Sequence, residues 1–103
     1  MVLDIIAFGV HPDDVELGCS GTLMAAIAEG KKVGVVDLTR GELGTRGTAE
    51  TRLVEATNAA AIMGLHHREN LGMADGFLQN DEAHQRKIIE VIRRFRPSIV
   101  LAN

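Results

Sequence analysis

The turn His11-Pro12-Asp13-Asp14 combines residue types that bind a metal ion and move a proton. An imidazole nitrogen and a carboxylate oxygen three residues apart on a tight turn can reach one ion at about 2.0–2.2 Å, the distance typical of zinc ligands. His11 and Asp14 are therefore candidate metal ligands. We expect the side chain of Asp13 to point elsewhere and to accept a proton from the metal-bound water. Metal-assisted hydrolysis is the reaction class that this pairing favours.

Other interpretations of the same turn stay open. Two aspartates at a helix start are often only a cap and a partner of the helix dipole, and one His-x-x-Asp spacing recurs by chance. The chain would then be a non-catalytic α/β module that binds a small molecule without metal. Hard carboxylates also suit Mg²⁺ in a phosphohydrolase, although a histidine ligand favours zinc or another transition metal. Nucleotide binding is disfavoured, because His11 and Asp14 replace two of the glycines that receive a pyrophosphate, and the carboxylates of the turn would repel it.

Other reactive side chains favour structural roles. Cys19 lies near a predicted helix start with no histidine placed beside it, which is typical of a small packing residue and not of a nucleophile. The arginines at positions 93, 94 and 96 fall in the last turn of a predicted helix, where cations complement the dipole.

Composition indicates which partners and surroundings to expect. The net charge of −3 supplies no basic field for a phosphate backbone, so a small molecule is favoured over nucleic acid. A single cysteine forms no internal disulfide, and no apolar run approaches the roughly 20 residues that span a bilayer. We therefore expect a cytoplasmic protein without a membrane partner.

The predicted elements alternate strand and helix along the chain. Short apolar runs indicate buried strands, and apolar residues at spacings of three and four, followed by Gly or Pro, indicate helices. The predicted strands cover residues 2–10, 33–38 and 98–102, with a short one near 66–71. The predicted helices cover residues 15–29, the segment between Thr48 and Gly64, and the segment from Asn80 or Asp81 to Pro97.

This alternation predicts an α/β fold, an open Rossmann-like parallel sheet with flanking helices. In such sheets ligands bind beyond the carboxyl ends of the strands. The turn at His11 and a glycine-rich polar loop at residues 39–48 both follow predicted strands, so both are expected at that edge. A buried strand at residues 98–102 with no covering helix after it suggests a domain truncated at its C-terminal side.

The sequence resembles the zinc-dependent N-acetylglucosaminyl deacetylase family that is called LmbE-like or PIG-L-like. The resemblance runs along essentially the whole chain and is closest to the branch that serves bacillithiol biosynthesis. The matching segments are His11-Pro-Asp-Asp-Val-Glu16, Gly18, Gly21-Thr22-Leu23, Asp37-Leu38-Thr39-Arg40-Gly41-Glu42, Arg52 with Glu55 and Ala56, and Asn70-Leu71-Gly72-Met73-Ala74-Asp75-Gly76.

The resemblance implies a role for each matched position. His11 and Asp14 are zinc ligands, and Asp13 is the general base. The substrate-binding positions, which line the sugar or aglycone pocket, are Glu42, Arg52 and Asp75. The implied reaction is removal of the N-acetyl group from an N-acetylglucosaminyl conjugate, N-acetylglucosaminyl malate in this branch, with homo-oligomers in the full-length form.

The chain departs from the family at its third metal ligand. The family takes a histidine from a His-rich segment after the strand that here ends at Asn103, and no such segment is present. His66, His67 and His84 are poor substitutes, because the first two point to opposite faces of an extended segment and the third lies on a surface helix. We therefore expect residues 1–103 to be the N-terminal part of a single α/β deacetylase domain, with little or no activity alone.

Overall fold

The computed structural model describes residues 1–103 as a parallel sheet with helices on both faces, which confirms the predicted fold class. All the strand pairs are parallel, and the strand order is β3-β2-β1-β4. The strands are β1 (Ile5–Gly9), β2 (Val33–Thr39), β3 (His67–Met73) and β4 (Ile99–Ala102). The helices are α1 (Asp14–Ala28), α2 (Ala49–Met63) and α3 (Glu82–Phe95). None of these helices is both long and apolar enough to cross a membrane.

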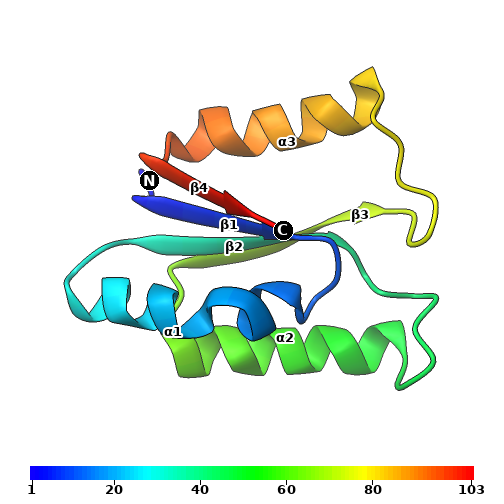
Figure 1. The fold of residues 1–103 in the computed structure, drawn as a ribbon, viewed down its shortest axis with the longest axis horizontal. Helices are drawn as coiled ribbons and strands as arrows, with labels where there is room; N and C mark the ends of the chain where they lie inside the picture. Colours follow the sequence, from blue (N-terminus) through cyan, green and yellow to red (C-terminus); the bar gives the residue numbers. More distant parts are fainter.

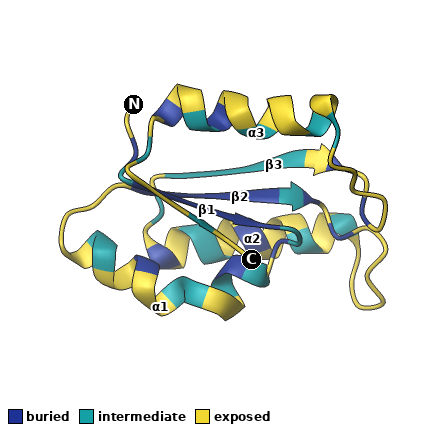
Figure 2. Cartoon of the chain, turned by 45° about the horizontal axis from the view of Figure 1, so that its top comes forward, coloured by how far each residue is buried: buried dark blue, intermediate teal, exposed yellow.

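The helices divide between the two faces of the sheet. Figure 1 shows α1 and α2 together on one face and α3 on the other. The central strands β1 and β2 are therefore covered from both sides, and every residue of β1 is buried. Figure 2 shows that burial falls away toward β4 and toward the outer surfaces of the helices. Continuous apolar sequence in the two central strands is what this double coverage requires.

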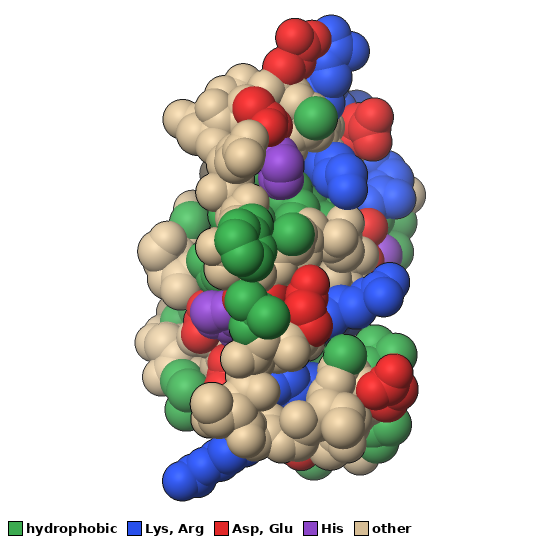
Figure 3. Space-filling view, turned by 90° about the vertical axis from the view of Figure 1, so that its right-hand side faces the viewer, with side chains coloured by type: hydrophobic (Ala, Val, Ile, Leu, Met, Phe, Trp, Pro, Cys, Tyr) green, Lys and Arg blue, Asp and Glu red, His purple; other side chains and the backbone are tan.

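The chain reverses its direction of growth across the sheet after β3. Strands β2 and β3 are added on one side of β1, whereas β4 pairs with the other side. The carboxyl ends of β1 and β4 therefore flank a switch point, which is where open α/β sheets place their ligands. Seen from this end, acidic and histidine side chains gather beside hydrophobic ones (Figure 3).

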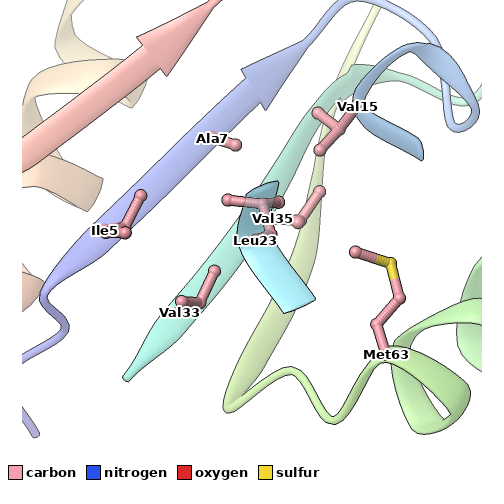
Figure 4. Close-up of a cluster of buried hydrophobic side chains, with 7 residues drawn as sticks. All are labelled: Ile5, Ala7, Val15, Leu23, Val33, Val35 and Met63. Carbon is pink, nitrogen blue, oxygen red and sulfur yellow. The ribbon is translucent and has the colours of Figure 1, made fainter. Parts of the chain in front are cut away.

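Two hydrophobic clusters fix the helices to the sheet. Alternate residues of β1 point to opposite faces, so Ile5 and Ala7 join one cluster, and Ile6 and Phe8 join the other. The cluster under α1 and α2 consists of Ile5, Ala7, Val15, Leu23, Val33, Val35 and Met63 (Figure 4). The cluster under α3 consists of Leu3, Ile6, Phe8, Val36, Val91 and Phe95.

Substitution of Leu23 by alanine should be strongly destabilising, because this side chain is completely buried in the first cluster. We expect a loss of about 2–5 kcal/mol in the free energy of unfolding, from lost burial and the cavity that remains. Denaturant unfolding of the protein measures this loss. Met24→Ala is the matched control: the neighbouring side chain is 43% exposed, so its truncation should cost much less. Equal losses for the two variants would contradict the packing described here.

Helix ends follow the predicted capping residues. The hydroxyl of Thr48 accepts a hydrogen bond from the backbone N–H of Thr51, and Gly64 ends α2 in the left-handed conformation with φ 78°. Of the two candidate caps for α3, Asp81 is the one used: its carboxylate accepts from the N–H of His84 at 2.9 Å. Hydrogen bonds from the backbone and the side chain of His84 lower the pKa of Asp81.

Several predicted details are wrong. The strand expected near residues 66–71 is present as β3, but its pairing with β2 carries it on to Met73. Strand β4 was expected to be buried, but Ile99 and Val100 are 50% and 46% exposed at the sheet edge. In α2, Leu53 belongs to the apolar spacing that predicted the helix, but its side chain faces solvent and is 63% exposed. Helix α1 is kinked at Cys19, whose φ of −150° is not helical.

Candidate active site

The turn between β1 and α1 places the predicted metal ligands at the switch point of the sheet. Asp14 is the first residue of α1, and its Oδ2 accepts a hydrogen bond from the backbone N–H of His11 at 3.0 Å. The preceding residue, Val10, is anchored to the end of β2, because its carbonyl accepts hydrogen bonds from the backbone and the hydroxyl of Thr39, both at 2.9 Å. Hydrogen bonds within the turn and to the end of β2 therefore fix the position of the turn.

The imidazole of His11 is oriented by two carboxylates. Its Nε2 lies 2.8 Å from Oδ1 of Asp75, and its Nδ1 lies 3.6 Å from Oδ2 of Asp14. Two ligands of a tetrahedral zinc ion, each about 2.0–2.2 Å from the metal, are about 3.4 Å apart. The Nδ1–Oδ2 separation is close to that value, and a carboxylate on the other ring nitrogen is the usual partner of a metal-binding histidine. The donor atoms therefore fit a divalent metal ion.

Asp75 is the buried member of this group. One oxygen contacts His11, and the other accepts a hydrogen bond from the backbone N–H of Leu43 at 2.9 Å. These hydrogen bonds, that from Leu43 first, lower the pKa of Asp75. Because both oxygens already have protein partners, the geometry favours Asp75 as the group that orients His11 over the predicted direct contact with a sugar.

Glu42 lies next to Asp75 but remains exposed. Its Oε2 accepts a hydrogen bond from the backbone N–H of Asp75 at 3.2 Å. Hydrogen bonds from its own N–H and from that of Asp75 lower the pKa of Glu42. Hydrogen bonds between backbone N–H groups and carboxylates therefore join the loop after β2 to the segment after β3. The carboxylate of Glu42 is still exposed, so a ligand can contact it.

Asp13 differs from its neighbours in having a free side chain. The residue is exposed at the N-cap position of α1, and its carboxylate makes no capping hydrogen bond. The capping interpretation of the aspartate pair therefore does not describe Asp13. An unpaired carboxylate beside the two candidate metal ligands is suited to accept a proton.

Arg52 packs against the glycine-rich loop. A Cβ atom added to Gly44 would lie 2.5 Å from Nη2 of Arg52, and one added to Gly41 would lie 2.9 Å from Nη1, so side chains at these positions would displace the guanidinium. Arg52 forms no ion pair with a carboxylate of the protein within 4.0 Å, the limit for such pairs. Its charge is thus open to an anionic ligand beside the loop.

Arg68 lies beside the site and was not predicted from the sequence. Arg68 of β3 bridges Asp37 of β2 and Glu16 of α1, and its side chain is only 9% exposed. Burial raises the pKa of Asp37, and the hydrogen bonds and charge of Arg68 oppose that rise. The sequence carried one signal of this cluster, the acidic Asp37 inside an apolar strand, because a buried charge requires a partner.

The other histidines have structural partners. Nδ1 of His66 accepts from the N–H of Val33, and His84 pairs with its capping aspartate. His67 packs against the ring of Phe95 in a tilted arrangement, with 4.5 Å between ring centroids. No group of three or more His, Cys, Asp or Glu side chains in the structure is arranged to hold a metal ion. Among residues 1–103, the candidate metal ligands are therefore the two residues His11 and Asp14.

Two further groups lie beside Asp14. The side-chain amide of Asn103, directly after β4, donates to Oδ2 of Asp14 at 3.1 Å. Cys19 lines a cavity of about 250 Å³ next to Asp14 and packs against the core. Burial first, and the charge of Glu16 second, raise the pKa of Cys19, which favours the neutral thiol and agrees with the predicted packing role.

Known proteins are similar to this chain in sequence and in fold. The chain is 41% identical over 71 residues to the uncharacterized deacetylase YaiS of Escherichia coli K12, covering 69% of this chain and 38% of that protein. It is 32% identical over 107 residues to the diacetylchitobiose deacetylase of Thermococcus kodakarensis, covering 97% and 40%. The crystal structure of the conserved protein TT1542 from Thermus thermophilus superposes with a TM-score of 0.90 at 47% identity, covering 96% of this chain and 45% of that one.

The chain therefore spans less than half of the length of these relatives. Residues 6–103 match the family described as PIG-L: GlcNAc-PI de-N-acetylase. The chain belongs to the PIG-L family, as the sequence resemblance predicted.

Proposed function

We propose that the protein is a zinc-dependent deacetylase that hydrolyses the N-acetyl group of an N-acetylglucosaminyl conjugate, with N-acetylglucosaminyl malate as its substrate. Residues 1–103 supply the N-terminal part of the single domain that carries this activity. The observation that supports the proposal is the arrangement of His11, Asp14 and Asp75, in which two donor atoms face each other at 3.6 Å and a carboxylate orients the histidine. The relatives named as deacetylases support the reaction class.

His11 Nδ1 and an oxygen of Asp14 would hold the metal ion. When bound there, zinc supplies a Lewis acid that polarises the amide carbonyl and acidifies water. Asp75 fixes the tautomer of His11 by accepting from its Nε2–H, which leaves Nδ1 unprotonated toward Asp14. Asn103 fixes the carboxylate of Asp14 in the same way, through its side-chain amide.

Asp13 would act as the general base. Its exposed carboxylate accepts the proton from the attacking water, whose oxygen bonds to the amide carbon. The carbon–nitrogen bond then breaks as the proton taken up by Asp13 passes to the leaving nitrogen, and acetate and the free amino sugar leave. Because the Asp13 side chain has no capping hydrogen bond, it can take up the proton without disrupting helix α1.

The loop residues would recognise the rest of the substrate. Glu42 is exposed beside the His11 group and can accept hydrogen bonds from sugar hydroxyls. Arg52 offers an unpaired guanidinium beside Gly41 and Gly44, where a planar fork can bind a substrate carboxylate. A malate aglycone carries such carboxylates, whereas a neutral aglycone does not.

Replacing Arg52 by alanine should therefore impair only anionic substrates. We expect KM for N-acetylglucosaminyl malate to rise about 10- to 100-fold, which corresponds to the roughly 1.5–3 kcal/mol of a charged hydrogen bond. Steady-state kinetics on the full-length protein measure this change, with an N-acetylglucosamine conjugate of a neutral alcohol as the matched control. An equal rise in KM for both substrates would contradict a role in carboxylate recognition.

The proposal is tested by two measurements on the full-length protein. Zinc content is measured after purification, and acetate release is measured from N-acetylglucosaminyl malate and from phosphate esters as the competing substrate class. Stoichiometric zinc with acetate release is the expected result. Phosphate release that depends on Mg²⁺ would favour a phosphohydrolase, and a protein that binds no metal and releases neither product would favour the non-catalytic binding module.

A further inference from the structure

We propose that Arg68 is a positioning residue for the deacetylase site: it holds the His11–Asp14 turn in the geometry that binds metal. The inference rests on the proposed function and adds a residue that neither the sequence motifs nor the family match assigns. It starts from the position of Arg68 in β3, two strands away from β1 in the sheet. The long side chain passes Asp37 of β2 and reaches the turn that follows β1.

The guanidinium forms two forked ion pairs. Its Nε and Nη2 donate to the two oxygens of Asp37 at 2.9 and 3.0 Å. Its Nη1 and Nη2 donate to the two oxygens of Glu16, both at 3.1 Å. Asp37 lies near the carboxyl end of β2, and Glu16 lies in the first turn of α1, just after Asp14. Arg68 thereby ties the start of the metal-binding helix to the sheet.

The same guanidinium also contacts the turn directly. Nη2 donates to the carbonyl oxygen of Pro12 at 3.3 Å, and Nη1 donates to that of Ala56 in α2 at 3.4 Å. Pro12 is buried and stands between the proposed ligand His11 and the proposed base Asp13. Fixing its carbonyl oxygen therefore restrains the peptide groups that carry both functional side chains.

These contacts leave the guanidinium no role in binding a ligand of its own. Arg68 lines a cavity of about 480 Å³, but its nitrogen atoms all donate to protein oxygens. The structure contains no buried polar side-chain atom without a hydrogen-bond partner, and the guanidinium of Arg68 follows this pattern. The role of Arg68 is to organise the neighbouring turn.

Charge supports the same conclusion. Burial raises the pKa of Asp37, and repulsion from the nearby carboxylates of Glu16 and Asp14 adds to that rise. Arg68 is the cation that contacts both Asp37 and Glu16. Without it, the repulsion would push α1 and its first residue away from β2. Lysine keeps the charge but not the planar fork, so it cannot form the two-point ion pairs with both carboxylates.

The test compares Arg68→Lys with Arg86→Lys in the full-length protein. Arg86 also pairs with a carboxylate, Glu82, but both side chains are exposed on α3. For each folded variant, zinc affinity is measured by competition with a chelator, and kcat and KM are measured with saturating zinc. For Arg68→Lys we expect zinc affinity to fall about 10- to 100-fold, which is the usual effect of removing a group that helps to orient metal ligands. We also expect kcat to fall about 10-fold with KM nearly constant, and Arg86→Lys to match the parent.

Other results would overturn the inference. Arg68→Lys with parental zinc affinity and kcat in its folded fraction would show that Arg68 only stabilises the fold. If Arg68→Lys does not fold, Glu16→Gln, which removes one fork and keeps the side-chain shape, decides: weaker zinc affinity supports the positioning role, and parental affinity overturns it. A parent protein without zinc or deacetylation would overturn the proposed function, and this inference with it, before any variant is compared.

Discussion

Asp13→Asn should lower kcat for deacetylation by about 10²–10⁴-fold, the contribution typical of a general base. The amide keeps the size of the side chain but cannot accept the proton from water. Because Asp13 is exposed and makes no capping hydrogen bond, the variant should fold like the parent. Zinc should stay bound in stoichiometric amount, since His11 and Asp14 are unchanged. Activity and zinc content measured on the same preparation of full-length protein check both expectations.

Glu90→Gln is the matched control for this experiment. It also neutralises one exposed carboxylate on a helix, but α3 lies on the opposite face of the sheet from α1 (Figure 1). We expect it to retain parental activity. Loss of zinc together with activity in Asp13→Asn would instead make Asp13 a ligand. Unchanged activity in Asp13→Asn would remove the general base from the proposed mechanism.

Local sequence signals predicted most of the fold, because they act over a few residues. The cap at Thr48 and the glycine at position 64 fix the two ends of α2 through contacts within one helical turn. The apolar runs of β1 and β2 identify strands that are covered on both faces. Strand β3 was harder to predict, because its polar sequence has no apolar periodicity. Its residues form a strand because they pair with partners on other elements.

The candidate site was predictable only where its residues are neighbours in the chain. The pairing of His11 with Asp14 follows from their spacing on one turn. The contact between His11 and Asp75 joins residues 64 positions apart, and that between Arg68 and Glu16 joins residues 52 apart. Nothing in the local pattern specifies which carboxylate meets which cation at such distances, since the sheet order decides it. The structure therefore favours an orienting role for Asp75 over the expected sugar contact, and it places Arg68 beside the site.

Comparison of Asp14→Ala with Asp75→Asn separates a metal ligand from the residue that orients one. Asp14→Ala removes an atom that would contact the ion, whereas Asp75→Asn leaves both proposed ligands in place and loses only the charge behind His11. For Asp75→Asn we expect a fall in zinc affinity of about 10- to 100-fold, and a larger fall for Asp14→Ala. Chelator competition on the full-length protein measures both affinities.

The two expectations for Asp75 make this comparison decisive. If Asp75 contacted the sugar, as the family resemblance implies, Asp75→Asn would raise KM and leave zinc affinity at the parental value. The structure argues otherwise, because the carboxylate is buried and its two oxygens are engaged by His11 and by the N–H of Leu43. An affinity loss in Asp75→Asn as large as in Asp14→Ala would contradict both roles and make Asp75 a ligand. The graded loss is expected because a histidine that has lost its carboxylate partner still binds, but with a freer ring and a less basic nitrogen.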